Sequence, residues 1–357
     1  MRDLLDDHWQ TLLALVLLAG FALSEAAGGG SFYISLSTRV AILAIAGIGL
    51  NIALGYGGMV SFGHAAFFGL GGYAAGVAVH HAFEGSNFLD GPIAVSGSGE
   101  LLTGLVAAGV TGLAAALFIG VFSLRTSGIY FIMITLAFAQ MLYYFAISFP
   151  TYGGEDGLPL YSRATLLGLD LSGDMTYFTV CYLVLVTAVI LSALITGSRF
   201  GAVLNGLREN ETRMIAIGFH PFRYRLTAFM VSAAMTAVAG ALYVHLDGFV
   251  SPSNMSWHRS GDLIVIVILG GVARTPGPIF GAAALIAMET VLGDFTERWQ
   301  FFLGLVLLGI VLFARGGLSG LLDRAAAALG LGPLGKQPDS EKDRARDRRQ
   351  PGEVRDA

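Results

Sequence analysis

The chain has 357 residues, of which 55% are hydrophobic and only 13% are charged, with a formal net charge of −4 at pH 7. A soluble domain carries roughly 25% charged residues, so this composition excludes an ordinary soluble protein and favours a membrane protein with many spans. The balance of charge excludes a basic surface for nucleic acid. A single cysteine, Cys181, excludes an internal disulfide framework and a cysteine metal site.

The apolar segments predict an all-α polytopic membrane protein. About 20 apolar residues cross the hydrocarbon layer. The eighth segment is short and the ninth is marginal, which leaves ten spans or eight spans with a re-entrant pair. Because Asp3, Asp6 and Asp7 precede the first segment, a retained span is favoured over a cleaved signal peptide. The segments cover about residues 10–26, 34–54, 60–80, 101–122, 128–149, 176–197, 224–247, 262–272, 278–293 and 298–314.

Eight glycines interrupt the apolar sequence between Asn51 and Gly76. Glycine costs about 1 kcal/mol relative to alanine inside a helix, so this density predicts a bend or close backbone packing. Ser61, Gly63 and His64 lie in this first break, and Ser61 precedes His64 by three residues on one helical face. An ionisable side chain at membrane depth indicates a functional site, although a histidine bonded to a neighbouring carbonyl is an open alternative.

A second broken segment runs from Leu269 to Leu292, where Gly270, Gly271 and Gly277 interrupt apolar sequence. Interrupted segments at corresponding places in two halves indicate a transport pathway. The alternative is that these glycines only let helices pack closely. We therefore predict Ser61, Gly63, His64, Gly270, Gly271 and Gly277 as substrate-pathway residues.

Arginines set the expected orientation. Five lie between residues 199 and 225, whereas residues 81–100 and 246–258 contain neither lysine nor arginine. By the positive-inside rule, residues 198–223 form a cytoplasmic loop and both termini are cytoplasmic. The loop is amphipathic, so it either docks into a groove of a soluble subunit or lies on the bilayer surface.

No nucleotide, metal or catalytic site is expected in the chain. Gly330, Gly335 and Lys336 match the first part of a phosphate-binding loop, but Gln337 replaces the required serine or threonine. The spacing of histidines and carboxylates does not fit a metal site. Energy for transport would then come from a partner.

Several motifs resemble the LivM-type permeases, which are membrane subunits of branched-chain amino acid ABC importers. The resemblance extends from about Asn51 to Phe313. The motif residues are Asn51, Gly55, Tyr56, Gly57, Gly58, Ser61, Gly63, His64, Ala65, Ala66, Phe67, Gly69, Tyr73, Gly153 to Leu158, Arg208 to Glu211, Ala216, Gly218, Ser232 to Ala234, Ala239 to Ala241, Gly270, Gly271, Gly277, Pro278, Gly281 and Ala282.

The resemblance implies a permease that imports leucine, isoleucine and valine across the bacterial inner membrane and has no enzyme activity of its own. It implies four partners: a homologous second permease, two cytoplasmic ABC ATPases that bind the ATP, and a periplasmic amino-acid-binding protein. Arg208, Glu209, Glu211, Ala216 and Gly218 would couple the permease to the ATPases. Arg213 departs from the small residue expected in that motif, which places the identity of the ATPase partner in question.

Three alternatives remain open from sequence. A similar permease branch serves urea and short-amide importers, and a secondary carrier or a membrane enzyme would need carboxylates or catalytic groups that this sequence hardly offers within its spans. Residues 1–332 are expected to form the permease domain, and residues 333–357 a charged, disordered cytoplasmic tail.

Overall fold

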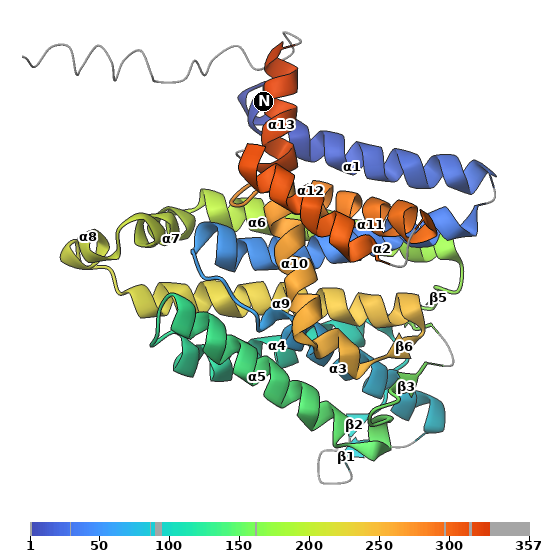
Figure 1. Ribbon diagram of the computed structural model, residues 1–357. Coiled ribbons are helices and arrows are strands. Elements are labelled where there is room, and N and C mark those ends of the chain that lie inside the picture. The colour runs from blue at the N-terminus through green and yellow to red at the C-terminus, as the bar shows by residue number, and fades with distance from the viewer. Residues whose placement is uncertain are drawn as a thin grey trace, which may run out of the picture.

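Helices dominate the computed structural model, which describes residues 2–28, 30–85, 87–89, 95–160, 163–295, 298–313 and 316–328 (Figure 1). This confirms the all-α membrane fold predicted from sequence. The tail predicted for residues 333–357 lies outside the described residues. The helices are α1 (Arg2–Gly28), α2 (Ser31–Asn51), α3 (His64–Glu84), α4 (Leu101–Ser123), α5 (Ile129–Ile147), α6 (Asp174–Gly197), α7 (Arg199–Glu209), α8 (Glu211–Ala216), α9 (Pro221–Asp247), α10 (Trp257–Gly270), α11 (Gly277–Phe295), α12 (Trp299–Phe313) and α13 (Gly317–Ala328).

Each predicted apolar segment coincides with one helix, in the order α1 to α6 and then α9 to α12. Within the described residues, six helical stretches are long and apolar enough to span a membrane: Ser31–Tyr56, α4, α5, α6, α9 and Gly277–Asp294. The 14-residue α10 is about 21 Å long, which is less than the roughly 30 Å hydrocarbon layer. The eighth predicted segment is therefore too short to span the membrane alone.

Helix α2 forms the centre of the bundle (Figure 1). It packs against α1, α6, α9, α10 and α11, and its most apolar window is 94% buried. On the other side of α9 lie α3 and α4. In Figure 1 most long helices run side by side, whereas α10 runs across their direction.

Small residues bring α3 and α9 into backbone contact. A Cβ atom at Gly71 would overlap the carbonyl of Ala237, and one at Gly240 would overlap the carbonyl of Phe68. Close approach of this kind lets membrane helices gain packing contacts that larger side chains prevent. The glycine-rich sequence of α3 thus has a packing role along its length.

Two ends of the bundle differ in structure (Figure 1). Helices α7 and α8 project from one end, and short antiparallel strand pairs lie toward the other. Strand β3 (Leu158–Pro159) pairs with β6 (Phe249–Val250), which ties the α5–α6 connection to the end of α9. The other pairs are β1 (Asn87–Leu89) with β2 (Val95–Ser96) and β4 (Thr165–Leu166) with β5 (Leu169–Asp170).

The two ends of the described chain meet each other. The Gln10 side chain of α1 donates a hydrogen bond to the Ser319 carbonyl oxygen of α13 at 3.0 Å. It also contacts the Asp323 carboxylate. This contact is consistent with the expectation that both termini lie on one side of the membrane, although the side itself stays a prediction.

Candidate functional site

The first broken segment begins where α2 changes its hydrogen-bonding pattern. Residues Ile52–Tyr56 form a π-helical turn, residues 57–63 are not helical, and α3 starts at His64. A π-helical turn often marks a functional position because it disrupts the regular ladder of a helix. The predicted break is therefore present, and the helix after it begins four residues later than the predicted segment at residue 60.

Asn51 connects the first break to the second. Its Nδ2 donates to the Arg274 carbonyl oxygen at 2.9 Å, and its Oδ1 accepts from the Ala273 backbone N–H at 3.0 Å. The side chain is 1% exposed. The amide of Asn51 thus satisfies both backbone polar groups of the loop between α10 and α11, and we call this pair of bonds the Asn51 clamp.

Arg208 brings α7 into contact with the same region. Its guanidinium donates to the carbonyl oxygen of Gly55, within the π-helical turn. The Arg208 side chain also lies against Gly58, where a Cβ atom would stand 3.0 Å from Cγ of Arg208. Gly58 has a φ of +67°, which favours glycine on backbone grounds as well. One residue of the predicted coupling loop therefore contacts the first break directly.

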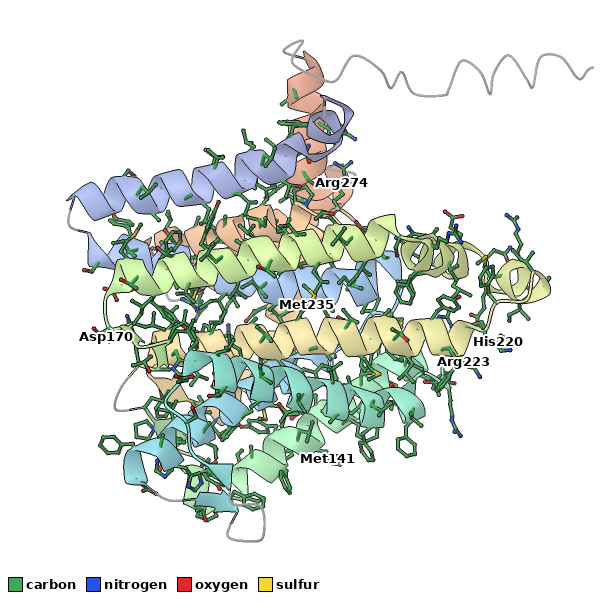
Figure 2. The ribbon with its side chains drawn as sticks, turned by 180° about the vertical axis from the view of Figure 1, so that it is seen from behind. Met141, Asp170, His220, Arg223, Met235 and Arg274 are labelled. Atoms are coloured by element: carbon green, nitrogen blue, oxygen red, sulfur yellow. The ribbon has the colours of Figure 1, made fainter. Side chains whose placement is uncertain are left out.

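In the second broken segment, the backbone at the end of α10 lies very close to the backbone at the start of α11. A Cβ atom at Gly270 would overlap the carbonyl of Gly277, and Gly271 has a φ of +125°. The Ser319 hydroxyl of α13 donates to the Gly270 carbonyl oxygen at 2.8 Å. Arg274 forms an ion pair with Asp323, and Figure 2 shows Arg274 beside α13. The three predicted glycines of this segment, Gly270, Gly271 and Gly277, thus lie together.

The three residues predicted in the first break hold the start of α3. His64 is fully buried, and its Nε2 lies 2.8 Å from the Ser232 hydroxyl of α9. Ser232 donates its own proton to the Gly49 carbonyl oxygen at 2.6 Å, so the His64 Nε2–H is the donor in the first bond. Ser61 accepts from the Gly63 N–H at 3.1 Å. These contacts agree with the bonding alternative for His64, while its role in a pathway stays a prediction.

The remaining predicted coupling residues lie on a short two-helix projection. Asn210 caps α8 by accepting from the Arg213 N–H at 2.9 Å, and Glu211 forms an ion pair with Arg225 at 2.9 Å. Glu209 and Ala216 are exposed, and Gly218 has a φ of +94° at the turn after α8. Figure 2 shows that His220 and Arg223 lie at this end of the molecule.

The apolar residues of α7 and α8 divide between two surfaces. Leu204 and Leu207 are each 1% exposed and belong to the surface of α7 that packs inward. In contrast, Ile215 and Ile217 are 54% and 63% exposed. The apolar pattern expected to serve one docking surface therefore holds α7 in place and leaves the residues around α8 uncovered.

Comparison with known proteins shows which family this architecture represents. Residues 32–312 match the family described as the permease component of the branched-chain amino acid transport system. The chain belongs to this family. The matched region contains both broken segments, the Asn51 clamp and the two-helix projection. The permease is thus a multi-pass membrane protein in which the predicted coupling loop touches the first broken segment.

Two similar curated proteins are the LivM high-affinity branched-chain amino acid transport permeases of Salmonella typhimurium and Escherichia coli. Each is 28% identical over 76% of this chain and 66% of its own length. A probable branched-chain amino acid permease of Methanocaldococcus jannaschii is 22% identical over 73% of this chain and 81% of its own length. The LsrC autoinducer 2 import permease of Salmonella typhi is 28% identical over 44% of this chain and 45% of its own length. No solved structure matches the chain.

Sequence reasoning missed two sets of contacts in the permease. Asn51 was part of the recognised motif but was not singled out as a site residue, although a buried amide beside a helix break is a signal for a backbone clamp. Arg39 of α2 pairs with Glu289 of α11 at 3.1 Å. No local sequence pattern indicates this pair, because the two residues are 250 positions apart.

Proposed function

We propose that the permease is the membrane subunit of an ATP-driven importer that carries leucine, isoleucine and valine into the cytoplasm. The observation that carries this proposal is the contact of the coupling loop with both broken segments, through Arg208 and then the Asn51 clamp. The family assignment and the LivM relatives support the substrate class. A secondary carrier would have no need for a loop connected to its broken helices in this way.

The partners follow from the two ends of the structure. Two cytoplasmic ATPases would dock at the α8 end, where Glu209, Ile215 and Ile217 are exposed, and would bind all of the ATP. The binding protein would dock at the end with the strands, and a homologous permease would complete the membrane part. This arrangement places both termini in the cytoplasm and the chain in the bacterial inner membrane.

The mechanism is a mechanical link between ATPase closure and helix breaks. Movement of α7 displaces the π-helical turn, because Arg208 holds the Gly55 carbonyl. The Asn51 clamp passes the displacement to the backbone of Ala273 and Arg274. Both breaks then change together, which is a requirement for switching access from one side of the membrane to the other.

In this proposal the predicted pathway residues contribute mainly their backbone polar groups. Gly270, Gly271 and Gly277 have no side chains, so their carbonyl and N–H groups would face the pathway when the second break opens. At the start of α3, the pathway would be faced by the backbone groups of Ser61, Gly63 and His64. Backbone groups of broken helices are suitable partners for the charged ends of an amino acid.

A competition experiment tests the substrate class. The complete complex is reconstituted in proteoliposomes, and uptake of labelled leucine is measured against an excess of isoleucine, valine, urea, acetamide or an autoinducer 2 analogue. The proposal predicts competition by isoleucine and valine only. Uptake of labelled urea without leucine uptake would move the permease to the urea and short-amide branch.

A further inference from the structure

A group of charged side chains lies on the face of the permease formed by α2, α9, α10 and α11, toward the end with the strands. Arg39 pairs with Glu289 at 3.1 Å, and Arg259 lies 3.9 Å from Asp262. Asp247, the last residue of α9, is within electrostatic reach of both arginines. We call these five residues the charged cluster.

The two pairs of the charged cluster form one electrostatic unit. Asp262 interacts with Arg259 and also with Glu289 and Arg39 of the other pair. Arg259 is held in place, since its guanidinium lies 4.9 Å from the centre of the Tyr243 ring and donates to Asn254 Oδ1 at 3.1 Å. Stacking on an aromatic ring and a side-chain hydrogen bond fix the direction of its remaining donors.

The position of the cluster requires water or protein opposite it. Arg39 is about 12 Å along α2 from its first residue, and Glu289 is about 9 Å from the last residue of α11. The two side chains are nevertheless 29% and 30% exposed. A charge at such depth is costly against lipid, so ionisable residues within spans face a water-filled cavity or another protein surface. This face is therefore a candidate wall of the transport pathway.

The cluster also has unused binding capacity for both signs of charge. Three carboxylates face two guanidinium groups, which leaves a place for one cation. Glu289 accepts from Nη2 of Arg39, and the Nε–H of Arg39 is buried without a hydrogen-bond partner in the described part of the chain. A guanidinium has five N–H donors and the Arg39 side chain is 29% exposed, so its terminal nitrogens keep donors for a second carboxylate.

We propose that the charged cluster is a binding site for the zwitterionic head group of an α-amino acid. The α-ammonium group would bind among Glu289, Asp262 and Asp247, and the α-carboxylate would bind to Arg39 and Arg259. A neutral solute such as urea cannot compensate these charges, so the cluster favours amino acids over short amides. This inference rests on the proposed import function and locates its substrate site within the membrane.

The test measures how much leucine the complete complex delivers for each ATP it hydrolyses. The variants are Arg39→Gln and Glu289→Gln, studied with the complex and its loaded binding protein in proteoliposomes. The matched control is Arg163→Gln, because Arg163 lies outside the spans at the same end of the molecule and forms a 2.9 Å ion pair with Asp174, the first residue of α6. Removing one charge-assisted contact should lower leucine per ATP about tenfold, equal to about 1.4 kcal/mol.

Assembly of these variants is checked separately, by the amount of ATPase subunit that co-purifies with the permease, which should equal the wild-type amount. The Arg163→Gln control should deliver normal leucine per ATP. The double variant with Arg39→Glu and Glu289→Arg keeps an ion pair between α2 and α11 but reverses its direction. We expect it to remain defective, since the substrate meets reversed charges.

Two results would overturn the inference. One is normal leucine per ATP in Arg39→Gln and Glu289→Gln. The other is full restoration by the reversed pair, which would show that the pair only holds α2 against α11. If the wild-type complex delivers no leucine at all, the proposed function itself fails, and the inference fails with it.

Discussion

The side chain of Asn51 and the backbone of Arg274, 223 positions apart in the sequence, are joined by a partly buried hydrogen bond. This bond and its companion to Ala273 join the end of α2 to the loop that starts α11. Arg208 of the coupling loop touches the turn that follows Asn51. Two helix breaks and the loop that is predicted to be cytoplasmic are therefore connected by three side-chain hydrogen bonds.

The Asn51 clamp predicts a coupling defect. Replacing Asn51 by alanine leaves the Ala273 N–H without its partner and leaves the Arg274 carbonyl oxygen with only the Gly277 N–H, at 3.3 Å. Each buried group left unpaired costs about 1–3 kcal/mol, so leucine uptake should fall by about tenfold or more. Asn51→Asp keeps the hydrogen-bond acceptor and loses the donor. Leucine uptake by this variant should fall by a similar amount. Normal uptake in both variants, measured with ATPase activity, would show that the clamp transmits nothing.

Arg208 provides the contact between the loop and the first break. In Arg208→Gln the shorter side chain cannot reach the Gly55 carbonyl, and ATP hydrolysis should continue while uptake falls. The control is Arg199→Gln, because Arg199 is exposed on the same helix. The ratio of leucine transported to ATP hydrolysed distinguishes the two variants. Equal ratios of leucine transported to ATP hydrolysed in the two variants would show that Arg208 has no role in coupling.

Glu211 pairs with Arg225 at 2.9 Å, so Glu211→Lys places two positive charges together at the start of α8. The pair is partly exposed, with 43% of Glu211 and 20% of Arg225 accessible, and such surface pairs contribute about 0–1 kcal/mol to stability, so membrane insertion and yield should stay normal. Uptake should nevertheless fall while ATPase activity becomes independent of the binding protein. Glu211→Gln, which removes the ion pair without placing a second positive charge beside Arg225, is the comparison variant. Recovery in the reversed pair, Glu211→Arg with Arg225→Glu, would show that the pair itself positions α8.

Gly270 and Gly261 test the packing of the second break. Both lie on α10, but a Cβ at Gly270 meets the Gly277 carbonyl and one at Gly261 meets nothing within 4 Å. Gly270→Ala should lower stability by about 1–3 kcal/mol through overpacking. Gly261→Ala should raise it by about 0.5–1 kcal/mol, since alanine is the better helix former. Thermal unfolding in detergent measures both, and similar melting temperatures would contradict the packing account.

The sequence predicted the helices well, because a span has to be apolar over a fixed length. The short segment at residues 262–272 became α10, which starts earlier at Trp257, where the Ser256 carbonyl oxygen accepts from the Arg259 N–H at 3.1 Å. Residues 60–63 were expected to begin a span but remain non-helical, where Ser260 and Thr135 hold the backbone of Phe62.

The contacts between distant residues could not be predicted in the same way. No local pattern shows that Arg39 meets Glu289 or that Asn51 meets Arg274, since these pairs depend on how α2, α10 and α11 pack. The amphipathic pattern of the coupling loop was also ambiguous, because one periodicity serves both inward packing at Leu207 and an exposed surface at Ile217. Packing, rather than propensity, decides such cases.

The most direct test of the account is leucine uptake into proteoliposomes that contain the complete complex, with either functional ATPase subunits or ATPase subunits inactivated by mutation. The account predicts uptake with ATP and functional ATPases, and none with the inactive ATPases whatever ion gradient is applied. Uptake by the permease alone, driven by a proton or sodium gradient, would contradict ATP-driven import and indicate a secondary carrier.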